Sequence, residues 1–202
     1  MIADVTGIVL AGGRSRRFGT DKALVAWQGE PLITQAVAIC ASLFPETVVA
    51  VKRPRRFRFL AAPGVRVVAD RHGDHHVLGG IESGLSHVRT SYGFVCACDM
   101  PFVQPAVVGT LRRAAEGYDV ALPIWGGYPQ PLCALYSVGC RGAIRDFLKA
   151  RDPCLCGLFQ RLRTRFLGEE EIRSADPDGI SFVDIDTPED YRRARSLLAM
   201  PC

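Results

Sequence analysis

The feature that most constrains this chain is an apolar run that leads directly into two glycines. Residues 5–11 are mostly β-branched and apolar, and Gly12-Gly13 follow at once. A buried strand that ends in a glycine turn is typical of open parallel sheets, whose ligands lie beyond the carboxyl ends of the strands. The run therefore predicts the first strand of an α/β sheet. Asp4 precedes it, and the basic start and cleavage site of a signal peptide are missing, which predicts a cytoplasmic protein.

Short apolar runs alternate with helical patterns along the next hundred residues. Predicted strands cover residues 47–51, 65–69, 92–98 and 119–123, and predicted helices cover 31–43, 81–88 and 105–116. Alternation of this kind favours a mostly parallel, doubly wound sheet with helices on both faces, which makes three layers.

The pattern changes after Pro123. Gly126-Gly127 predicts a turn, and the residues beyond it predict a strand, a helix, a late strand and a last helix. These elements are expected at 132–138, at 139–149, at 182–185 and from Thr187-Pro188-Glu189-Asp190 onward. The last segment has a helix-capping signature with proline at the first helical position. Because no break in composition marks a boundary, we expect one domain over residues 1–202.

Composition supports a globular protein with a large core. The 202 residues are 48% hydrophobic and 23% charged, and the apolar stretches are too short to span a membrane. Cys96, Cys98 and Cys133 lie in apolar surroundings, so we expect buried, reduced thiols. Cys154 and Cys156 leave a surface disulfide or an adventitious metal site as the alternative.

The segment after the first strand concentrates positive charge beside the glycines. Arg14, Arg17 and Lys22 fall within a few residues of Gly12-Gly13. Glycine amides can approach phosphate oxygens where a side chain would collide, and the basic groups suit a triphosphate. Neither the P-loop spacing nor the dinucleotide-binding Gly-x-Gly-x-x-Gly is present. The segment therefore predicts a nucleotide-binding loop of another kind.

Asp99 is the candidate metal ligand. It follows the predicted strand 92–98, so it projects from the same edge of the sheet as the glycine loop. A carboxylate beside substrate phosphates suits Mg²⁺, whereas capping of the following turn is the structural alternative.

Five segments together resemble the molybdenum cofactor guanylyltransferases, which have the nucleotide-diphospho-sugar transferase fold. In chain order they are Leu10-Ala11-Gly12-Gly13-Arg14-Ser15-x-Arg17-x-Gly19-x-Asp21-Lys22-Ala23, then Asp70 with Leu78-Gly79-Gly80-Ile81, then Cys98-Asp99-Met100-Pro101-Phe102, Gln130-Pro131-Leu132 and Asp186-Thr187-Pro188-Glu189-Asp190. The resemblance covers about 190 residues.

The resemblance implies a Mg²⁺-dependent enzyme that transfers GMP from GTP to the terminal phosphate of molybdenum-molybdopterin and releases pyrophosphate. The implied catalytic residues are Lys22, Asp99, Arg14 and Arg17, and Asp99 is the implied metal ligand. Nucleotide binding is expected at Leu10, Ala11, Gly12, Gly13, Lys22, Lys52, Asp70, Gly80 and Asp99. The implied partners are GTP and molybdopterin, with transient contact to cofactor delivery proteins or target apoenzymes.

The sequence departs from the family pattern at three places. Lys52 stands where an asparagine is common, His76-Val77 replaces a Gly-Pro, and Asp184 and Asp186 replace two asparagines. Asp186 is expected either to contact the metal or to cap the last helix. The departures keep open a cytidylyl or sugar-phosphate nucleotidyltransferase, or a catalytically weak nucleotide sensor.

Two clusters outside the glycine loop favour structural interpretations. The basic run 52–58 and the formal charge of +4 could attract nucleic acid, but no recognition motif accompanies them, so we expect a solvated loop and no nucleic-acid partner. His72, His75 and His76 are expected in a mobile loop over the nucleotide site.

Overall fold

The computed structural model describes residues 1–12, 21–72, 77–149 and 155–198. The strands are β1 (Val5–Ala11), β2 (Ala26–Trp27), β3 (Glu30–Pro31), β4 (Glu46–Val51), β5 (Val65–Ala69), β6 (Tyr92–Ala97), β7 (Val120–Trp125), β8 (Tyr128–Pro129), β9 (Cys133–Ser137) and β10 (Thr164–Leu167). The helices are α1 (Leu32–Leu43), α2 (Val77–Leu85), α3 (Pro105–Ala114), α4 (Arg141–Leu148), α5 (Leu155–Arg161), α6 (Glu169–Arg173) and α7 (Pro188–Leu198). Short 3-10 helices are η1 (Lys22–Leu24), η2 (Pro54–Leu60), η3 (Val138–Cys140) and η4 (Ile180–Phe182).

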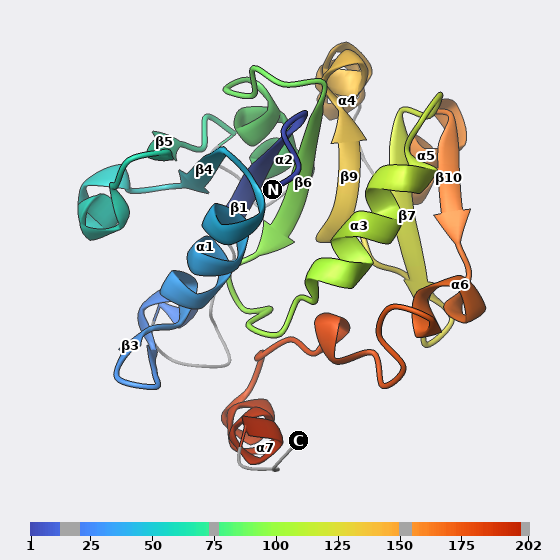
Figure 1. The fold of residues 1–202 in the computed structure, drawn as a ribbon. Coiled ribbons are helices and arrows are strands. Elements are labelled where there is room, and N and C mark those ends of the chain that lie inside the picture. Colours follow the sequence, from blue (N-terminus) through green and yellow to red (C-terminus); the bar gives the residue numbers. More distant parts are fainter. Residues whose placement is uncertain (13–20, 73–76, 150–154, 199–202) are drawn as a thin grey trace.

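A mostly parallel sheet forms the centre of the fold. Its strands lie in the order β10-β7-β9-β6-β1-β4-β5, and β8 pairs with β7. Strand β9 runs antiparallel to both of its neighbours, while β1, β4, β5 and β6 are parallel. In Figure 1 the arrow of β9 accordingly points up while those of β6 and β10 point down. The predicted α/β sheet is confirmed.

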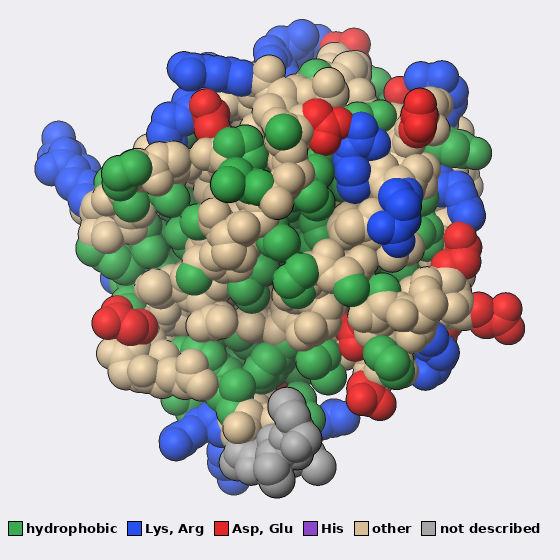
Figure 2. All heavy atoms as spheres, viewed as in Figure 1, with side chains coloured by type: hydrophobic (Ala, Val, Ile, Leu, Met, Phe, Trp, Pro, Cys, Tyr) green, Lys and Arg blue, Asp and Glu red, His purple; other side chains and the backbone are tan. Residues whose placement is uncertain are grey.

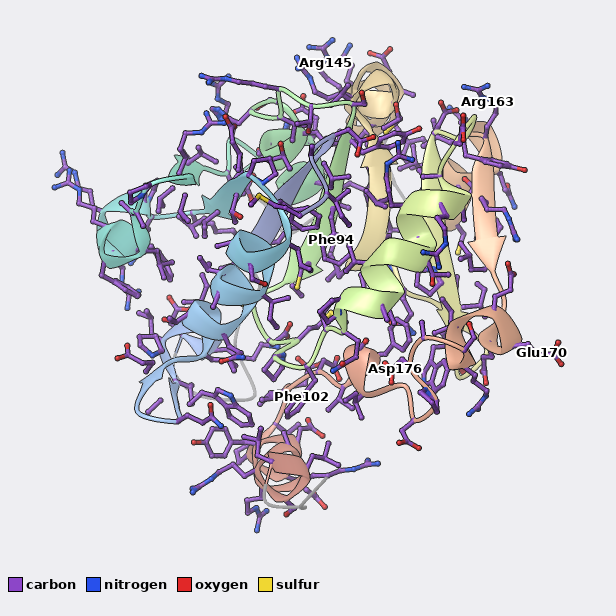
Figure 3. The ribbon with its side chains drawn as sticks, in the orientation of Figure 1. Phe94, Phe102, Arg145, Arg163, Glu170 and Asp176 are labelled. Atoms are coloured by element: carbon purple, nitrogen blue, oxygen red, sulfur yellow. The ribbon has the colours of Figure 1, made fainter. Side chains whose placement is uncertain are left out.

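Helices cover both faces of this sheet, as the alternation of elements predicts. Figure 1 shows α1 and α3 in front of the sheet and α2 behind it. Phe94 of β6 packs toward the front, 5.7 Å from the ring centroid of Phe44, and its position is labelled in Figure 3. A second core cluster behind the sheet joins α2, α4 and α5 through Ile81, Ile144 and Leu158. Three layers result.

Most boundaries agree with the sequence-based prediction, but α2 begins four residues earlier than expected. Gly79 and Gly80 argue against a helix by propensity alone. In the structure packing requires the first of them, because a Cβ on Gly79 would lie 2.5 Å from the Cβ of His72. Tertiary contact therefore overrides local preference here.

The predicted late strand at residues 182–185 is wrong. The buried carboxylate of Asp176 accepts hydrogen bonds from the N–H groups of Ile180 and Ser181, at 3.1 and 2.8 Å, and these bonds fold the backbone into η4. Asp176 is labelled in Figure 3. Gly179 precedes η4 with a φ of +66°, a left-handed conformation that glycine adopts without strain.

The cysteine prediction is confirmed for the described residues. Cys96, Cys98 and Cys133 are buried free thiols, and Cys156 is an exposed one. Cys154 lies outside the described residues. The basic run after Lys52 forms η2 rather than an irregular loop, with Arg55, Arg56 and Arg58 exposed. Basic side chains protrude at the left margin of Figure 2, the side on which Figure 1 draws this part of the chain. No described helix is long and apolar enough to cross a membrane.

The last helix, α7, packs below the sheet on a small aromatic cluster. The ring of Trp27 makes edge contacts with Tyr191 and Phe102, at centroid distances of 5.4 and 5.9 Å. Figure 3 shows Phe102 between α7 and the lower edge of the sheet. The predicted capping box is present, because Asp190 N–H donates to Thr187 Oγ1 and Thr187 N–H donates to the Asp190 carboxylate.

We expect Tyr191→Phe to lower the free energy of unfolding by about 1 kcal/mol, the usual net contribution of one hydrogen bond. The Tyr191 hydroxyl donates to the Ala26 carbonyl at 2.6 Å and so ties α7 to β2. Urea denaturation measures the change. Tyr128→Phe is the matched control, because Tyr128 is 74% exposed. Equal stability of both variants would contradict this role of Tyr191.

Candidate functional site

The parallel register brings the ends of three strands to one edge of the sheet. Leu10 of β1 pairs with Ala97 of β6, and the Cys98 N–H donates a hydrogen bond to the Leu10 carbonyl at 3.0 Å. On the other side Ala11 pairs with Val51 of β4. The residues that follow these strands therefore meet along the lower edge in Figure 1.

Lys22 and two aspartates form the charged centre of this edge. The Lys22 ammonium donates to the carboxylates of both Asp99 and Asp186, which are 77 and 164 residues away in sequence. Asp99 follows β6 and is 9% exposed, while η1 carries Lys22. Asp186 comes from the segment between η4 and α7. The structure thus joins the first, middle and last parts of the chain in one cluster.

The electrostatics of the cluster favour a charged lysine. Burial alone lowers the pKa of Lys22, but the charges of Asp99 and Asp186 and their hydrogen bonds outweigh it and raise this pKa above its usual range. Asp184 shows the opposite situation. Its side chain reaches the surface, but partial burial removes some of the water around the carboxyl and raises its pKa. The negative charges of Asp186 and Asp99 raise this pKa further. Two carboxylates, those of Asp99 and Asp186, therefore share the single positive charge of Lys22, and a further negative charge on Asp184 is disfavoured.

A second group of predicted residues lies close to Gly12. A Cβ placed on Gly12 would lie 3.6 Å from Asp70 Oδ2 and 3.8 Å from Lys52 Cε. On β1 itself, Leu10 rests against Gly80 of α2, where an added Cβ would lie 3.4 Å from the Leu10 side chain. The start of the glycine loop is therefore flanked by one carboxylate and one lysine.

Several predictions concern residues that the structure does not describe. Gly13, Arg14, Ser15, Arg17 and Gly19 lie outside the described residues, as do His75 and His76.

The structure decides between the two roles expected for Asp186 and corrects the prediction for His72. Asp186 does not cap α7, because Thr187 and Asp190 do so and the Asp186 carboxylate contacts Lys22. His72 does not belong to a free loop, since its ring lies 3.0 Å from Glu82 of α2. Sequence reasoning missed Glu82, for which the only signal is one charge in the apolar run of α2.

A mostly parallel α/β sheet with a lysine and aspartates beyond the carboxyl ends of its strands is the arrangement of a nucleotidyltransferase of the nucleotide-diphospho-sugar transferase fold. Comparison with known proteins agrees. The model of the MobA-like NTP transferase domain family matches residues 7–165. A "Probable molybdenum cofactor guanylyltransferase" of Pelotomaculum thermopropionicum is 35% identical over 190 residues, which are 94% of this chain and 91% of the relative.

Two other comparisons extend over nearly the whole chain. The molybdenum cofactor guanylyltransferase of Desulfosudis oleivorans is 33% identical over 196 residues, which are 96% of each chain. The crystal structure of molybdopterin-guanine dinucleotide biosynthesis protein A from Archaeoglobus fulgidus superposes with a TM-score of 0.83 at 28% identity and covers 96% of this chain and 98% of that one. This chain belongs to the molybdenum cofactor guanylyltransferases, within the MobA-like NTP transferase family.

Proposed function

We propose that this protein transfers GMP from GTP to the terminal phosphate of molybdenum-molybdopterin. A phosphate oxygen of the acceptor attacks the α-phosphorus of GTP, the bond between the α-phosphorus and the bridging oxygen breaks, and pyrophosphate leaves. The product is the molybdopterin guanine dinucleotide cofactor. Membership of the family supports this reaction, and the observation that carries it is the convergence of Lys22, Asp99 and Asp186 at the edge where β6 ends.

The reaction needs positioning and charge compensation more than a strong base. The attacking phosphate is already an anion, so the main requirement is to hold two negatively charged groups in line. Lys22 is proposed to meet the charge that develops at the α-phosphate and the leaving oxygen. The Gly12 and Gly13 amides, with Arg14 and Arg17, are proposed to hold the β- and γ-phosphates. Leu10, Ala11, Lys52, Asp70 and Gly80 are proposed to surround the nucleoside and its phosphates.

Asp99 and Asp186 suit a divalent cation such as Mg²⁺. Their carboxylate oxygens are hard donors, and they converge on one positive charge, that of Lys22. Asp99 is proposed as the principal ligand of the cation and Asp186 as a second contact to it. When bound, Mg²⁺ would supply charge compensation and orientation for the phosphates.

The proposal takes residues 1–202 as one nucleotidyltransferase domain, because both the first strand and the segment before α7 contribute to the site. GTP and molybdopterin are its substrates. We propose that the protein works in the cytoplasm and meets cofactor delivery proteins or target apoenzymes transiently. Nucleic acid and membranes have no part in this reaction.

We expect pyrophosphate release with GTP, Mg²⁺ and molybdopterin together, and at least about tenfold less with ATP, CTP or UTP, a preference of about 1.4 kcal/mol. Parallel incubations with the four nucleotides measure this preference, and samples without molybdopterin are the control. Faster release with CTP would assign the chain to cytidylyl transfer, and release without an acceptor would contradict a transferase.

A further inference from the structure

Among the residues that the structure describes, hydrogen bonds to the Asp70 carboxylate reach only one of its two oxygens. Asp70 Oδ1 accepts from the Ser83 hydroxyl and from the His72 N–H, each at 3.0 Å. The Ser83 hydroxyl also accepts from the Arg71 N–H at 3.0 Å, which fixes its direction. The other oxygen, Oδ2, is the atom closest to the place a Cβ on Gly12 would take. Oδ1 is therefore occupied by described groups of the protein, while Oδ2 faces Gly12.

A second contact from α2 holds the turn that contains these donors. The His72 ring nitrogen Nε2 lies 3.0 Å from Glu82 Oε2, and the other Glu82 oxygen lies 3.5 Å from Arg141 Nε. Glu82 is 7% exposed, so its carboxylate is buried between the His72 ring and the Arg141 guanidinium. The close approach of His72 to α2 is possible because residue 79 is glycine. Residues 70–72 are thus attached to α2 by both Ser83 and Glu82.

Such attachments matter where a side chain must meet a ligand in one orientation. A free aspartate at the end of a strand can rotate its carboxylate, and ordering it on binding costs conformational entropy. A hydroxyl and a backbone amide that saturate one oxygen remove most of this freedom before binding. Loss of the Glu82 carboxylate, which contacts both the His72 ring and the Arg141 guanidinium, would release the turn as well.

We infer that Ser83 and Glu82 are positioning residues for the nucleoside part of the nucleotide. They hold Asp70 so that Oδ2 accepts a hydrogen bond from a nucleoside hydroxyl or N–H group. This inference rests on the proposed function, because Asp70 is a proposed nucleotide contact. In this inference α2 orients the residue that contacts the nucleoside, while the glycine loop and Lys22 contact the phosphates.

Ser83→Ala is the principal test. We expect the dissociation constant and the KM for GTP to rise about tenfold, which corresponds to about 1.4 kcal/mol, while kcat stays within about twofold. Inorganic tripolyphosphate, which has no nucleoside, should inhibit the variant and the wild type equally. Ser86→Ala is the matched control, because its hydroxyl donates to the Ser83 carbonyl at 2.7 Å and does not contact Asp70. It should bind GTP as the wild type does.

Two further variants distinguish positioning from general damage to the site. Glu82→Gln keeps the size of the side chain and removes its charge, and it should raise the KM for GTP about threefold to tenfold with tripolyphosphate inhibition unchanged. In an Asp70→Asn background, Ser83→Ala should add less than about a twofold effect, because residues that act through one contact are not additive. Additive losses, or weaker tripolyphosphate inhibition, would overturn the inference.

Calorimetry separates this inference from the proposed function. If the wild type binds GTP but releases no pyrophosphate, the proposed reaction fails, and the binding constants of the Ser83 and Glu82 variants still decide the positioning role. If turnover is normal and Ser83→Ala binds GTP with wild-type affinity, the positioning role fails and the reaction stands.

Discussion

Asp99→Asn should lower kcat by about 10³-fold while leaving the protein folded, a loss of about 4 kcal/mol in transition-state stabilisation. Asparagine has nearly the same size, so the packing of this buried position is kept. The variant loses the negative charge that we propose as the principal contact for Mg²⁺. It also removes one of the two carboxylates on Lys22, whose ammonium keeps Asp186 as its partner.

Steady-state rates over a range of Mg²⁺ concentrations test this expectation. The loss should be largest at limiting Mg²⁺ and smaller at high concentration, because weaker metal binding is partly restored by mass action. Asp146→Asn is the matched control, since Asp146 is an exposed aspartate that pairs with Lys149 at 2.8 Å. A wild-type rate for Asp99→Asn at limiting Mg²⁺ would exclude Asp99 as the ligand.

Lys22→Ala should lower kcat by about 10²-fold or more, in line with roughly 3 kcal/mol for the loss of one electrostatic donor. The negative charge that Lys22 meets grows as pyrophosphate departs, so its interaction is stronger in the transition state than in the bound substrate. GTP affinity should fall much less, because the glycine-loop amides, Arg14 and Arg17 are proposed to retain the triphosphate.

The same variant separates an enzyme from a nucleotide sensor. A sensor has no transition state to stabilise, so the whole effect of Lys22→Ala would appear in equilibrium binding. Single-turnover rates and calorimetry on one preparation give both quantities, with Lys149→Ala as the exposed-lysine control. A loss of affinity with unchanged single-turnover chemistry would reject the role proposed for Lys22.

Local sequence patterns predicted the elements whose boundaries depend on local chemistry. The apolar run of β1, the helical pattern at residues 31–43 and the capping box of α7 are all patterns of neighbouring residues, and the structure confirms all three. Predictions were weaker where packing decides. No local pattern predicts an element in residues 155–173, yet they form α5, β10 and α6. Strand β10 lies at the edge of the sheet, and its parallel pairing with β7 fixes its place.

The candidate site divides in the same way. The glycine turn, Lys22, Asp70 and Asp99 were recognisable because each lies within or directly after a pattern for a strand end or a basic loop. The surroundings of Asp184 and Asp186 were not recognisable, because the sequence predicts a strand at residues 182–185, next to the capping segment of α7. Asp176 and Gly179 turn the chain there instead, and Ile185 N–H reaches the Asp99 carbonyl at 3.1 Å.

The sequence by itself determined the α/β class, the positions of its first strands along the chain and the residue types that we propose to meet a nucleotide. These features follow from hydrophobic periodicity and from residues next to one another in the chain. Only the tertiary structure decided that Asp186 shares Lys22 with Asp99 and that Glu82 and Ser83 hold the turn after β5. Contacts between side chains 10 to 164 residues apart depend on how α2 and α7 pack against the sheet, and no local pattern encodes that distance.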